Sequence, residues 1–166
     1  TKVDEEVADD TTTKVRSGSY TTYVEDLYNL PARSVGPGII NGITVYARWT
    51  GYHVAVDYAA YIKIAMRTNT VTYYGTEYSQ TVAAWTNISH AWSQNPNTVA
   101  AWTWGEIDAL QIGIAMKRQA NYDGTEGHCT QVYVEVDYSP RFSLAFRKTR
   151  RRTGGRTRFY PELSLG

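Results

Sequence analysis

Hydrophobic and polar residues alternate along several short stretches of the chain, which is the pattern of a β-strand with one buried face. The alternation is clearest in residues 43–50, 62–67, 112–117 and 130–138. Weaker strand patterns occupy residues 12–16, 20–30 and 85–92. Turn residues punctuate the chain about every 8 to 12 residues, so we expect about eight to ten short strands.

One stretch predicts a helix. Thr103 followed by Glu106 has the spacing of a capping box, in which a hydroxyl and a carboxylate satisfy the first free amides of a helix. Ile107 and Leu110 lie three residues apart, so one face of a single helical turn is apolar. We expect the adjacent end of the core to be covered by two large side chains, Trp102 and Trp104.

These patterns predict an all-β fold, an antiparallel β-sandwich or jelly roll with one short helix and extended termini. An α/β fold would require several long helical patterns, which this sequence lacks. Two further segments have less regular patterns. Residues 71–74 and 77–82 are expected to form a hairpin around Gly75, and residues 54–60 fit either a short strand or a loop.

Charge divides the chain into three parts. Residues 1–19 form an acidic N-terminal arm, and residues 20–140 carry the sandwich. Residues 141–166 form a basic extension with eight Lys or Arg residues and one acid, whereas residues 1–140 have nine bases and fifteen acids. The net charge of +1 therefore hides an acidic body joined to a basic tail.

Composition excludes several classes of protein. No apolar run approaches the roughly 20 residues that a membrane-spanning helix needs. The chain has a single cysteine, Cys129, so it cannot form an internal disulfide. The neighbouring His128 suggests a metal pair, but zinc normally takes four ligands with recognisable spacing, and we expect Cys129 to be a small buried residue. We expect no cofactor.

No catalytic constellation can be assembled from the sequence. Glu106 is explained by the capping box and Asp108 by an exposed helix face. Glu135 and Asp137 lie on the expected outer side of one strand, where carboxylates are solvated. The three histidines, His53, His90 and His128, are far apart in the chain. The sequence contains no nucleophile elbow, phosphate loop or dinucleotide fingerprint.

Aromatic side chains are the best signal for a small ligand. A group of them could offer flat faces for stacking on sugar rings: Tyr46, Tyr73, Tyr74, Tyr78, Trp85 and Trp92. The interpretation that we favour is that these rings cover the rim of the core and subunit interfaces. Asn87-Ile-Ser89 also matches the acceptor sequence for N-glycosylation.

The tail beyond residue 140 mixes basic and apolar residues. Its arginines could bind the phosphates of nucleic acid, but the segment has no folded recognition motif. Phe142, Leu144 and Phe146 alternate as in a strand, which suits the addition of a strand to a neighbouring molecule. We therefore favour a protein partner, and the expected subunit interface comprises Phe142, Leu144, Phe146, Arg150, Arg151, Arg152, Phe159 and Tyr160.

Several motifs together resemble a family of β-sandwich modules found in phage virion proteins and in surface proteins of bacteria and archaea. They are Asp9-Asp10-Thr-Thr-Thr, Asp26-Leu-Tyr-Asn-Leu30, Asn95-Pro96 with Ala101-Trp-Thr-Trp-Gly-Glu-Ile-Asp-Ala-Leu110, and Thr130-Gln-Val-Tyr-Val-Glu-Val-Asp-Tyr138. The resemblance covers residues 3–138. It implies a jelly-roll-like module of virion or extracellular structures and no catalytic residues.

We therefore expect a non-enzymatic, self-assembling structural subunit of a virion, such as a phage capsid or tail component, or of an extracellular filament. Its partners would be other copies of itself and other virion or surface proteins. A carbohydrate-binding module of a surface protein, with glycans as partners, is the main alternative, and a sandwich-fold hydrolase is the third. The expected location is the virion or the cell surface.

Overall fold

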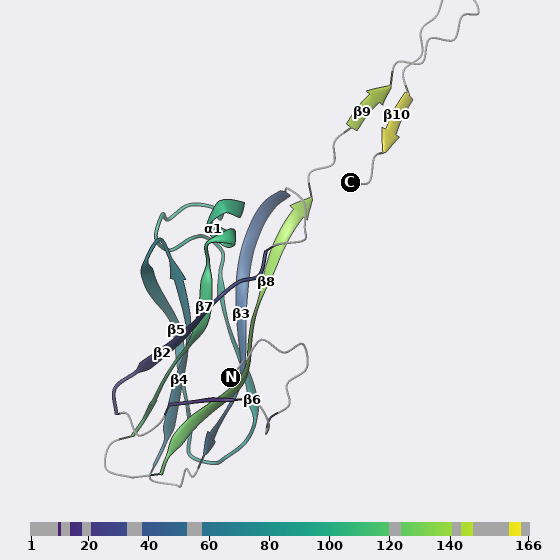
Figure 1. Cartoon of the computed structure of the whole chain (residues 1–166). Helices are drawn as coiled ribbons and strands as arrows, with labels where there is room; N and C mark the ends of the chain where they lie inside the picture. The colour runs from purple at the N-terminus through teal and green to yellow at the C-terminus, as the bar shows by residue number, and fades with distance from the viewer. Residues whose placement is uncertain are drawn as a thin grey trace, which may run out of the picture.

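The computed structural model describes residue 10, residues 14–17, 21–32, 38–52, 58–119 and 124–140, and the backbone of 144–147 and 160–163. Within these residues there are ten strands and one helix (Figure 1). The elements in chain order are β1 (Val15–Arg16), β2 (Val24–Asn29), β3 (Gly38–Tyr52), β4 (Ala60–Thr68), β5 (Val71–Gln80), β6 (Thr86–Trp92), α1 (Trp104–Asp108), β7 (Gln111–Arg118), β8 (Glu126–Pro140), β9 (Leu144–Arg147) and β10 (Tyr160–Leu163).

The strands form two four-stranded sheets that face each other, which confirms the predicted antiparallel sandwich. Sheet A has the order β1-β8-β3-β6, and sheet B has the order β2-β7-β4-β5. Every pairing within them is antiparallel. Strands β3 and β8 are the two central strands of sheet A. They pair along their whole length, from Gly38 opposite Pro140 to Tyr52 opposite Glu126.

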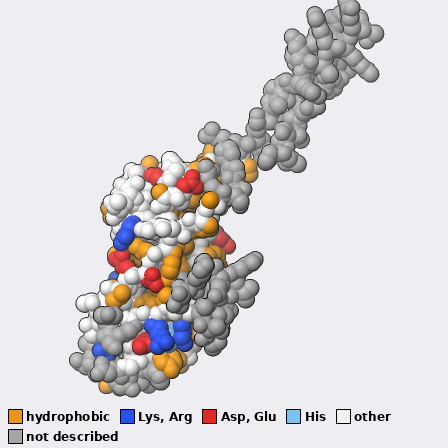
Figure 2. Space-filling view, viewed as in Figure 1, with side chains coloured by type: hydrophobic (Ala, Val, Ile, Leu, Met, Phe, Trp, Pro, Cys, Tyr) orange, Lys and Arg blue, Asp and Glu red, His pale blue; other side chains and the backbone are white. Residues whose placement is uncertain are grey.

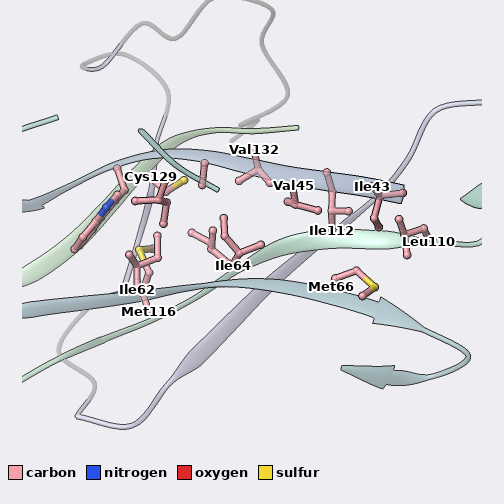
Figure 3. Packing of buried hydrophobic residues seen from close by; sticks show 14 of the residues in the cluster. Ile43, Val45, Ile62, Ile64, Met66, Leu110, Ile112, Met116, Cys129 and Val132 are labelled. Atoms are coloured by element: carbon pink, nitrogen blue, oxygen red, sulfur yellow. The ribbon is translucent and has the colours of Figure 1, made fainter. Parts of the chain in front are cut away.

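The core lies between the two sheets (Figure 3). The predicted alternation is confirmed in three strands, since the inward side chains of β3, β4 and β7 are buried: Ile43, Val45, Ala47, Trp49, Ile62, Ile64, Met66, Ile112, Ile114 and Met116. In β8, Val132 is buried, whereas Val134 and Val136 are partly buried against the core. Burial along β8 therefore decreases toward its C-terminal end.

Helix α1 begins as predicted. The Thr103 hydroxyl accepts a hydrogen bond from the backbone amide of Glu106 at 3.3 Å, and the Glu106 carboxylate accepts one from the amide of Thr103 at 2.8 Å. Ile107 and Leu110 are buried. Trp102 is buried as well, and partly buried Trp104 packs against the core and donates its indole N–H to the Gly38 carbonyl. This end of the sandwich is thus closed by the helix and two indoles.

The expected hairpin around Gly75 is wrong, because β5 runs continuously from Val71 to Gln80. The turn lies earlier, at Asn69 and Thr70, which both have positive φ. Gly75 instead marks a register shift opposite β4, and a Cβ there would lie 2.6 Å from the His90 ring. Glycine therefore permits a β-bulge and close contact with β6 rather than a turn.

Strand β7 was expected to bury one face, but Gly113 and Ala115 on its other face are buried as well. The expected strand at residues 12–16 is observed only as β1, and residues 53–57 lie outside the described part of the chain. Beyond β8, β9 and β10 pair with each other in a two-stranded antiparallel sheet. Figure 1 shows this tail hairpin, the pair β9 and β10, outside the sandwich.

Candidate functional site

The outer face of sheet A carries aromatic and charged side chains from neighbouring strands. Tyr46 of β3 lies opposite Tyr133 of β8, and their rings stack with centroids 4.8 Å apart. The Tyr46 hydroxyl donates a hydrogen bond to the Glu135 carboxylate at 2.9 Å, and this bond raises the pKa of Tyr46. The sequence placed Tyr46 among the exposed aromatics, and its ring is half-buried against this cross-strand partner.

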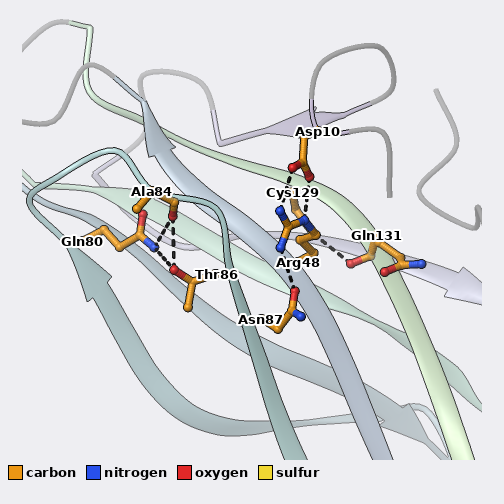
Figure 4. A network of polar contacts seen from close by, with 8 residues as sticks. All are labelled: Asp10, Arg48, Gln80, Ala84, Thr86, Asn87, Cys129 and Gln131. Carbon is orange, nitrogen blue, oxygen red and sulfur yellow. Dashed lines mark hydrogen bonds and ion pairs between the residues drawn. The ribbon is translucent and has the colours of Figure 1, made fainter. Parts of the chain in front are cut away.

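Arg48 organises the polar part of the same face (Figure 4). Its Nε and Nη2 atoms each donate to a carboxylate oxygen of Asp10 at 2.6 Å, and Nη1 donates to the Asn87 amide oxygen at 3.2 Å. The Trp85 ring lies 5.8 Å from the guanidinium carbon, within the range of a cation–π contact. Hydrogen bonding to Arg48 holds the pKa of Asp10 below its ordinary value, so this bidentate pair is ionised at neutral pH.

A hollow of about 240 Å³ opens on this face beside the Tyr46 ring. It is lined by side chains and backbone of three strands: Tyr46, Ala47, Arg48, Asn87, Ile88, Ser89, Gln131 and Tyr133. Small Ser89 lies directly across from Tyr46 on β6, which leaves room next to the ring. An aromatic wall beside amide and guanidinium groups is the chemistry that would suit a polyhydroxylated ligand. Asn87, the predicted glycosylation acceptor, is exposed on the rim of this hollow.

The other aromatic candidates divide into two groups. Tyr73, Tyr78 and Trp92 are partly buried and pack against the core, as the rim interpretation predicts. Exposed Tyr74 donates its hydroxyl to Glu25, which raises its pKa to about 12, and Glu25 also pairs with Arg67 at 3.2 Å. Its ring therefore belongs to a polar cluster on sheet B rather than to the hollow on sheet A.

The outer face of sheet B is covered by such clusters. The Tyr23 hydroxyl bonds to Glu77, and both Lys63 and Lys117 lie over the Tyr23 ring, at 4.4 and 4.6 Å from its centroid. Burial and the bond to Glu77 raise the pKa of Tyr23, while the same bond lowers the pKa of Glu77. Sequence reasoning missed this cluster, because its members are tens of residues apart and no local pattern links them.

The strand beside β8 at the edge of sheet A is β1, and among the described residues it pairs with His128 and Cys129. Farther along β8, Tyr133, Glu135 and Asp137 are exposed on the outer face of sheet A.

The structure does not bring the candidate catalytic residues together. Glu106 caps α1 and accepts a bond from buried Asn95, and Asp108 is exposed on α1. Among the described residues, no group of three or more His, Cys, Asp or Glu side chains is arranged to hold a metal ion. Cys129 is fully buried, which raises the pKa of its thiol to about 12, as expected for a packing residue.

His128 lies buried near the N-terminal end of β8. Its Nε2 is 3.0 Å from the Glu126 carboxylate, and its ring stacks on Tyr52 at 4.6 Å. Burial lowers the pKa of His128, and nearby Lys14 adds to this effect. Figure 2 shows Lys and Arg side chains gathered beside a histidine at the end of the sandwich opposite α1.

The predicted interface residues are the part of the chain that the structure describes least. Leu144 and Phe146 lie in β9 and Tyr160 lies in β10, so the strand pattern predicted for the tail is present in its backbone. The remaining predicted interface residues lie outside the described residues: Phe142, Arg150, Arg151, Arg152 and Phe159. In the described part of the chain, no helix is long and apolar enough to cross a membrane.

Comparisons of the chain with protein-family models, curated proteins and solved structures found no match. The resemblance to the virion and surface β-sandwich family stays a prediction. The features of the described chain that bear on function are the hollow on sheet A and the tail hairpin.

Proposed function

We propose that the chain is a non-enzymatic structural subunit that assembles with copies of itself, as part of a virion or of an extracellular filament. One observation carries the proposal: among the described residues, the C-terminal strands β9 and β10 pair with each other in a sheet separate from both sheets of the sandwich. The two sheets of the sandwich and the core between them form without this hairpin. This arrangement supports a role for the hairpin in contacts with another molecule.

The size of the tail hairpin supports this view. Each of its strands has four residues, and an isolated two-stranded hairpin is at best marginally stable in water. Packing against another sheet would stabilise it. The hairpin is also part of a segment with eight basic residues, whereas the rest of the chain has a surplus of acids. Unlike surfaces that meet head to tail produce rings or open filaments.

The direct test compares the full chain with a chain that ends at residue 140. Both proteins are examined by light scattering and by electron microscopy over a range of concentrations. We expect the full chain to form ordered oligomers or fibres and the shortened chain to be a folded monomer with the same circular dichroism. Assembly of the shortened chain, or a full chain that stays monomeric at every concentration, would overturn the proposal.

Nucleic acid is the competing partner for a basic tail, and salt separates the two cases. Phosphate binding releases counterions and weakens steeply with salt, whereas assembly through β-pairing and apolar burial depends on salt much less. The full chain is therefore mixed with labelled single- and double-stranded DNA at low and moderate salt. Tight binding that removes the self-assembly would favour nucleic acid over a second copy.

A second candidate, carbohydrate binding, is favoured by the hollow beside Tyr46. Its aromatic wall and its Arg48 and Asn87 edges match the groups that hold sugar rings. A glycan array with the wild-type chain tests it, with Tyr46→Ala and Tyr74→Ala as a matched pair. Loss of glycan binding with Tyr46→Ala but not with Tyr74→Ala would support this candidate. Absence of binding to any glycan would remove it.

A further inference from the structure

We propose that the hollow beside Tyr46 is a binding site for an acidic sugar, and that Asp10 holds the carboxylate position of this site from within the chain. A uronate ring would stack on Tyr46, and its carboxylate would replace that of Asp10 on Arg48. This inference rests on the second candidate function, carbohydrate binding. It deepens that function, because it names the class of sugar and the group that competes with it.

The Tyr46 ring has different neighbours on its two sides. On the β8 side it stacks on Tyr133, with the two ring planes 10° apart. On the β6 side its cross-strand neighbour is the small Ser89, which lines the hollow together with Asn87. An aromatic face with hydroxyl and amide groups around it can hold a sugar ring by stacking and by hydrogen bonds to its hydroxyls. The hollow of about 240 Å³ is smaller than the pockets that hold drug-sized ligands, so it suits a single ring.

Arg48 adds a positive group to the same hollow. It lies two residues after Tyr46 on β3, so both side chains are on the outer face, about 7 Å apart along the strand. A sugar ring and its exocyclic carboxylate can span that separation. Asn87 accepts a hydrogen bond from Nη1 at 3.2 Å, and the Trp85 ring lies 5.8 Å from the guanidinium carbon. Groups other than Asp10 therefore also hold the guanidinium in place.

Asp10 shows how a carboxylate binds to this guanidinium (Figure 4). Its two oxygens accept hydrogen bonds from Nε and Nη2 of Arg48, each at 2.6 Å, which is the bidentate geometry that guanidinium and carboxylate groups favour. The side chains of Arg48 and Asp10 are 26% and 29% exposed, so the pair can open without disturbing the core. Asp10 also has a φ of 53°, in the left-handed region that non-glycine residues adopt uncommonly. Its release would allow a more ordinary backbone conformation, which favours exchange with another carboxylate.

The charges along β3 would orient an acidic ring. Glu135 of β8 is paired with Thr44, two residues before Tyr46, and its carboxylate accepts the Tyr46 hydroxyl at 2.9 Å. Arg48 lies on the opposite side of Tyr46 along the strand. A ligand carboxylate is thus repelled at the Glu135 end and attracted at the Arg48 end, and complementary charges of this kind fix the register of a bound molecule. A neutral sugar lacks this preference.

The basic cluster on sheet B is less suitable for an acidic ring. The amines of Lys63 and Lys117 already lie over the Tyr23 ring, and both also pair with Glu77. The aromatic face and the positive charges are therefore used by one another. On sheet A, the ring and the guanidinium lie side by side around the hollow.

Nuclear magnetic resonance titrations of the full chain test the site. The probes are galacturonate and glucuronate, with galactose and glucose as neutral counterparts that differ only at C6. We expect at least one acid to shift the Arg48 Nε–H signal and to bind about tenfold more tightly than its neutral counterpart. Asp10→Asn should strengthen binding of that acid about tenfold, which corresponds to a wild-type site that is open for about a tenth of the time. Binding of the neutral sugars should not change.

Matched variants show which groups are responsible. Arg48→Gln should remove the preference for the acid, whereas Arg67→Gln, which removes a guanidinium paired with Glu25 on sheet B, should leave it intact. Tyr46→Ala should abolish binding of acidic and neutral sugars alike. Acetate is the probe for the carboxylate alone and should bind more weakly than either uronate. The comparison of acidic with neutral sugars in the wild-type chain depends on no variant, so it stands if Arg48→Gln does not fold.

The outcomes separate this inference from carbohydrate binding itself. Equal binding of acidic and neutral sugars, both lost with Tyr46→Ala, would overturn the acidic-sugar site while carbohydrate binding stands. Binding that does not change with Asp10→Asn would overturn the competition by Asp10. Acetate that binds as tightly as the uronates, or an acidic peptide that binds more tightly than they do, would also overturn the inference. If no sugar binds to the wild type or to Asp10→Asn, both the inference and the second candidate function fail.

Discussion

The two sheets share one core but differ on their outer faces. On sheet B the outer face is closed. Small residues of β7, Gly113 and Ala115, are buried, and the Tyr23 cluster with Glu77, Lys63 and Lys117 lies on the same sheet with its charges paired. On sheet A the outer face has a hollow and the exposed acids Glu135 and Asp137. This difference makes sheet A the more suitable of the two outer faces for the ligand or subunit contacts proposed above.

The closed face of sheet B depends on close approach of the backbone. A Cβ on Gly113 would lie 1.8 Å from the carbonyl oxygen of Asp26 in β2, so any larger residue must displace that strand. We expect Gly113→Ala to lower the free energy of unfolding by about 3 kcal/mol, the upper end of typical overpacking costs. Gly105→Ala in α1 is the matched control, since no atom lies within 4 Å of the new methyl group. Denaturant unfolding of both variants measures the difference, and equal stability would contradict a tightly closed sheet B.

The capped end near α1 belongs to both sheets and should respond independently of their outer faces. Thr103→Ala removes the hydroxyl that accepts the Glu106 amide, and we expect a cost of about 1 kcal/mol. Thr103→Ser keeps the hydroxyl and should restore most of the stability. If Thr103→Ala and Thr103→Ser unfold at the same denaturant concentration, the cap does not contribute to the stability of this end.

The polar clusters on sheet B predict a lower free energy of unfolding at alkaline pH. The bond to Glu25 raises the pKa of Tyr74 to about 12, and burial raises that of Tyr23, so the unfolded chain loses these protons first as the pH passes about 10. Stability should therefore fall as the pH rises above that value. The fall should be smaller in the protein with Tyr23→Phe and Tyr74→Phe. Cys129 contributes equally to both proteins, and an unchanged pH profile would argue against these two bonds.

His128 in sheet A predicts a smaller loss of stability, at mildly acidic pH. Burial lowers the pKa of His128 below that of an unfolded histidine, near 6.5, although Glu126 opposes this shift. As the pH falls below about 6.5 the unfolded chain takes up a proton that the folded chain excludes, so stability should decrease. In the His128→Asn protein, the melting temperature should change less between pH 7.5 and about 5.5 than it does in the wild type. A wild-type melting temperature that rises over this range would contradict the assignment.

The sequence predicted the parts of the fold that depend on local periodicity. Alternation located β3, β4, β7 and β8, and the spacing of Thr103 and Glu106 located α1. Gly75 was predicted to lie in a turn, but it lies at a β-bulge within β5. A glycine within a strand pattern fits either structure, and the nearby His90 ring, which explains the need for glycine, is not visible in the local sequence. Burial also depends on position, so Val134 and Val136 alternate as predicted but are less buried than Val132.

The candidate site could be predicted only in fragments. Arg48 and Asp10 are 38 residues apart, and nothing in either local sequence indicates that they form a bidentate pair. Tyr46 and Tyr133 were visible as outward positions, but their stacking depends on the register between β3 and β8.

Amide hydrogen exchange tests the central claim of self-assembly most directly, since it reports which backbone amides gain protection when the full chain assembles. Exchange is measured by mass spectrometry for the full chain and for the chain that ends at residue 140, both at a concentration at which the full chain assembles. The account predicts that at least one surface strand of the sandwich exchanges more slowly in the full chain, while the buried residues 112–116 of β7 exchange equally in both. Equal exchange of every described strand of the sandwich in the two proteins would contradict it.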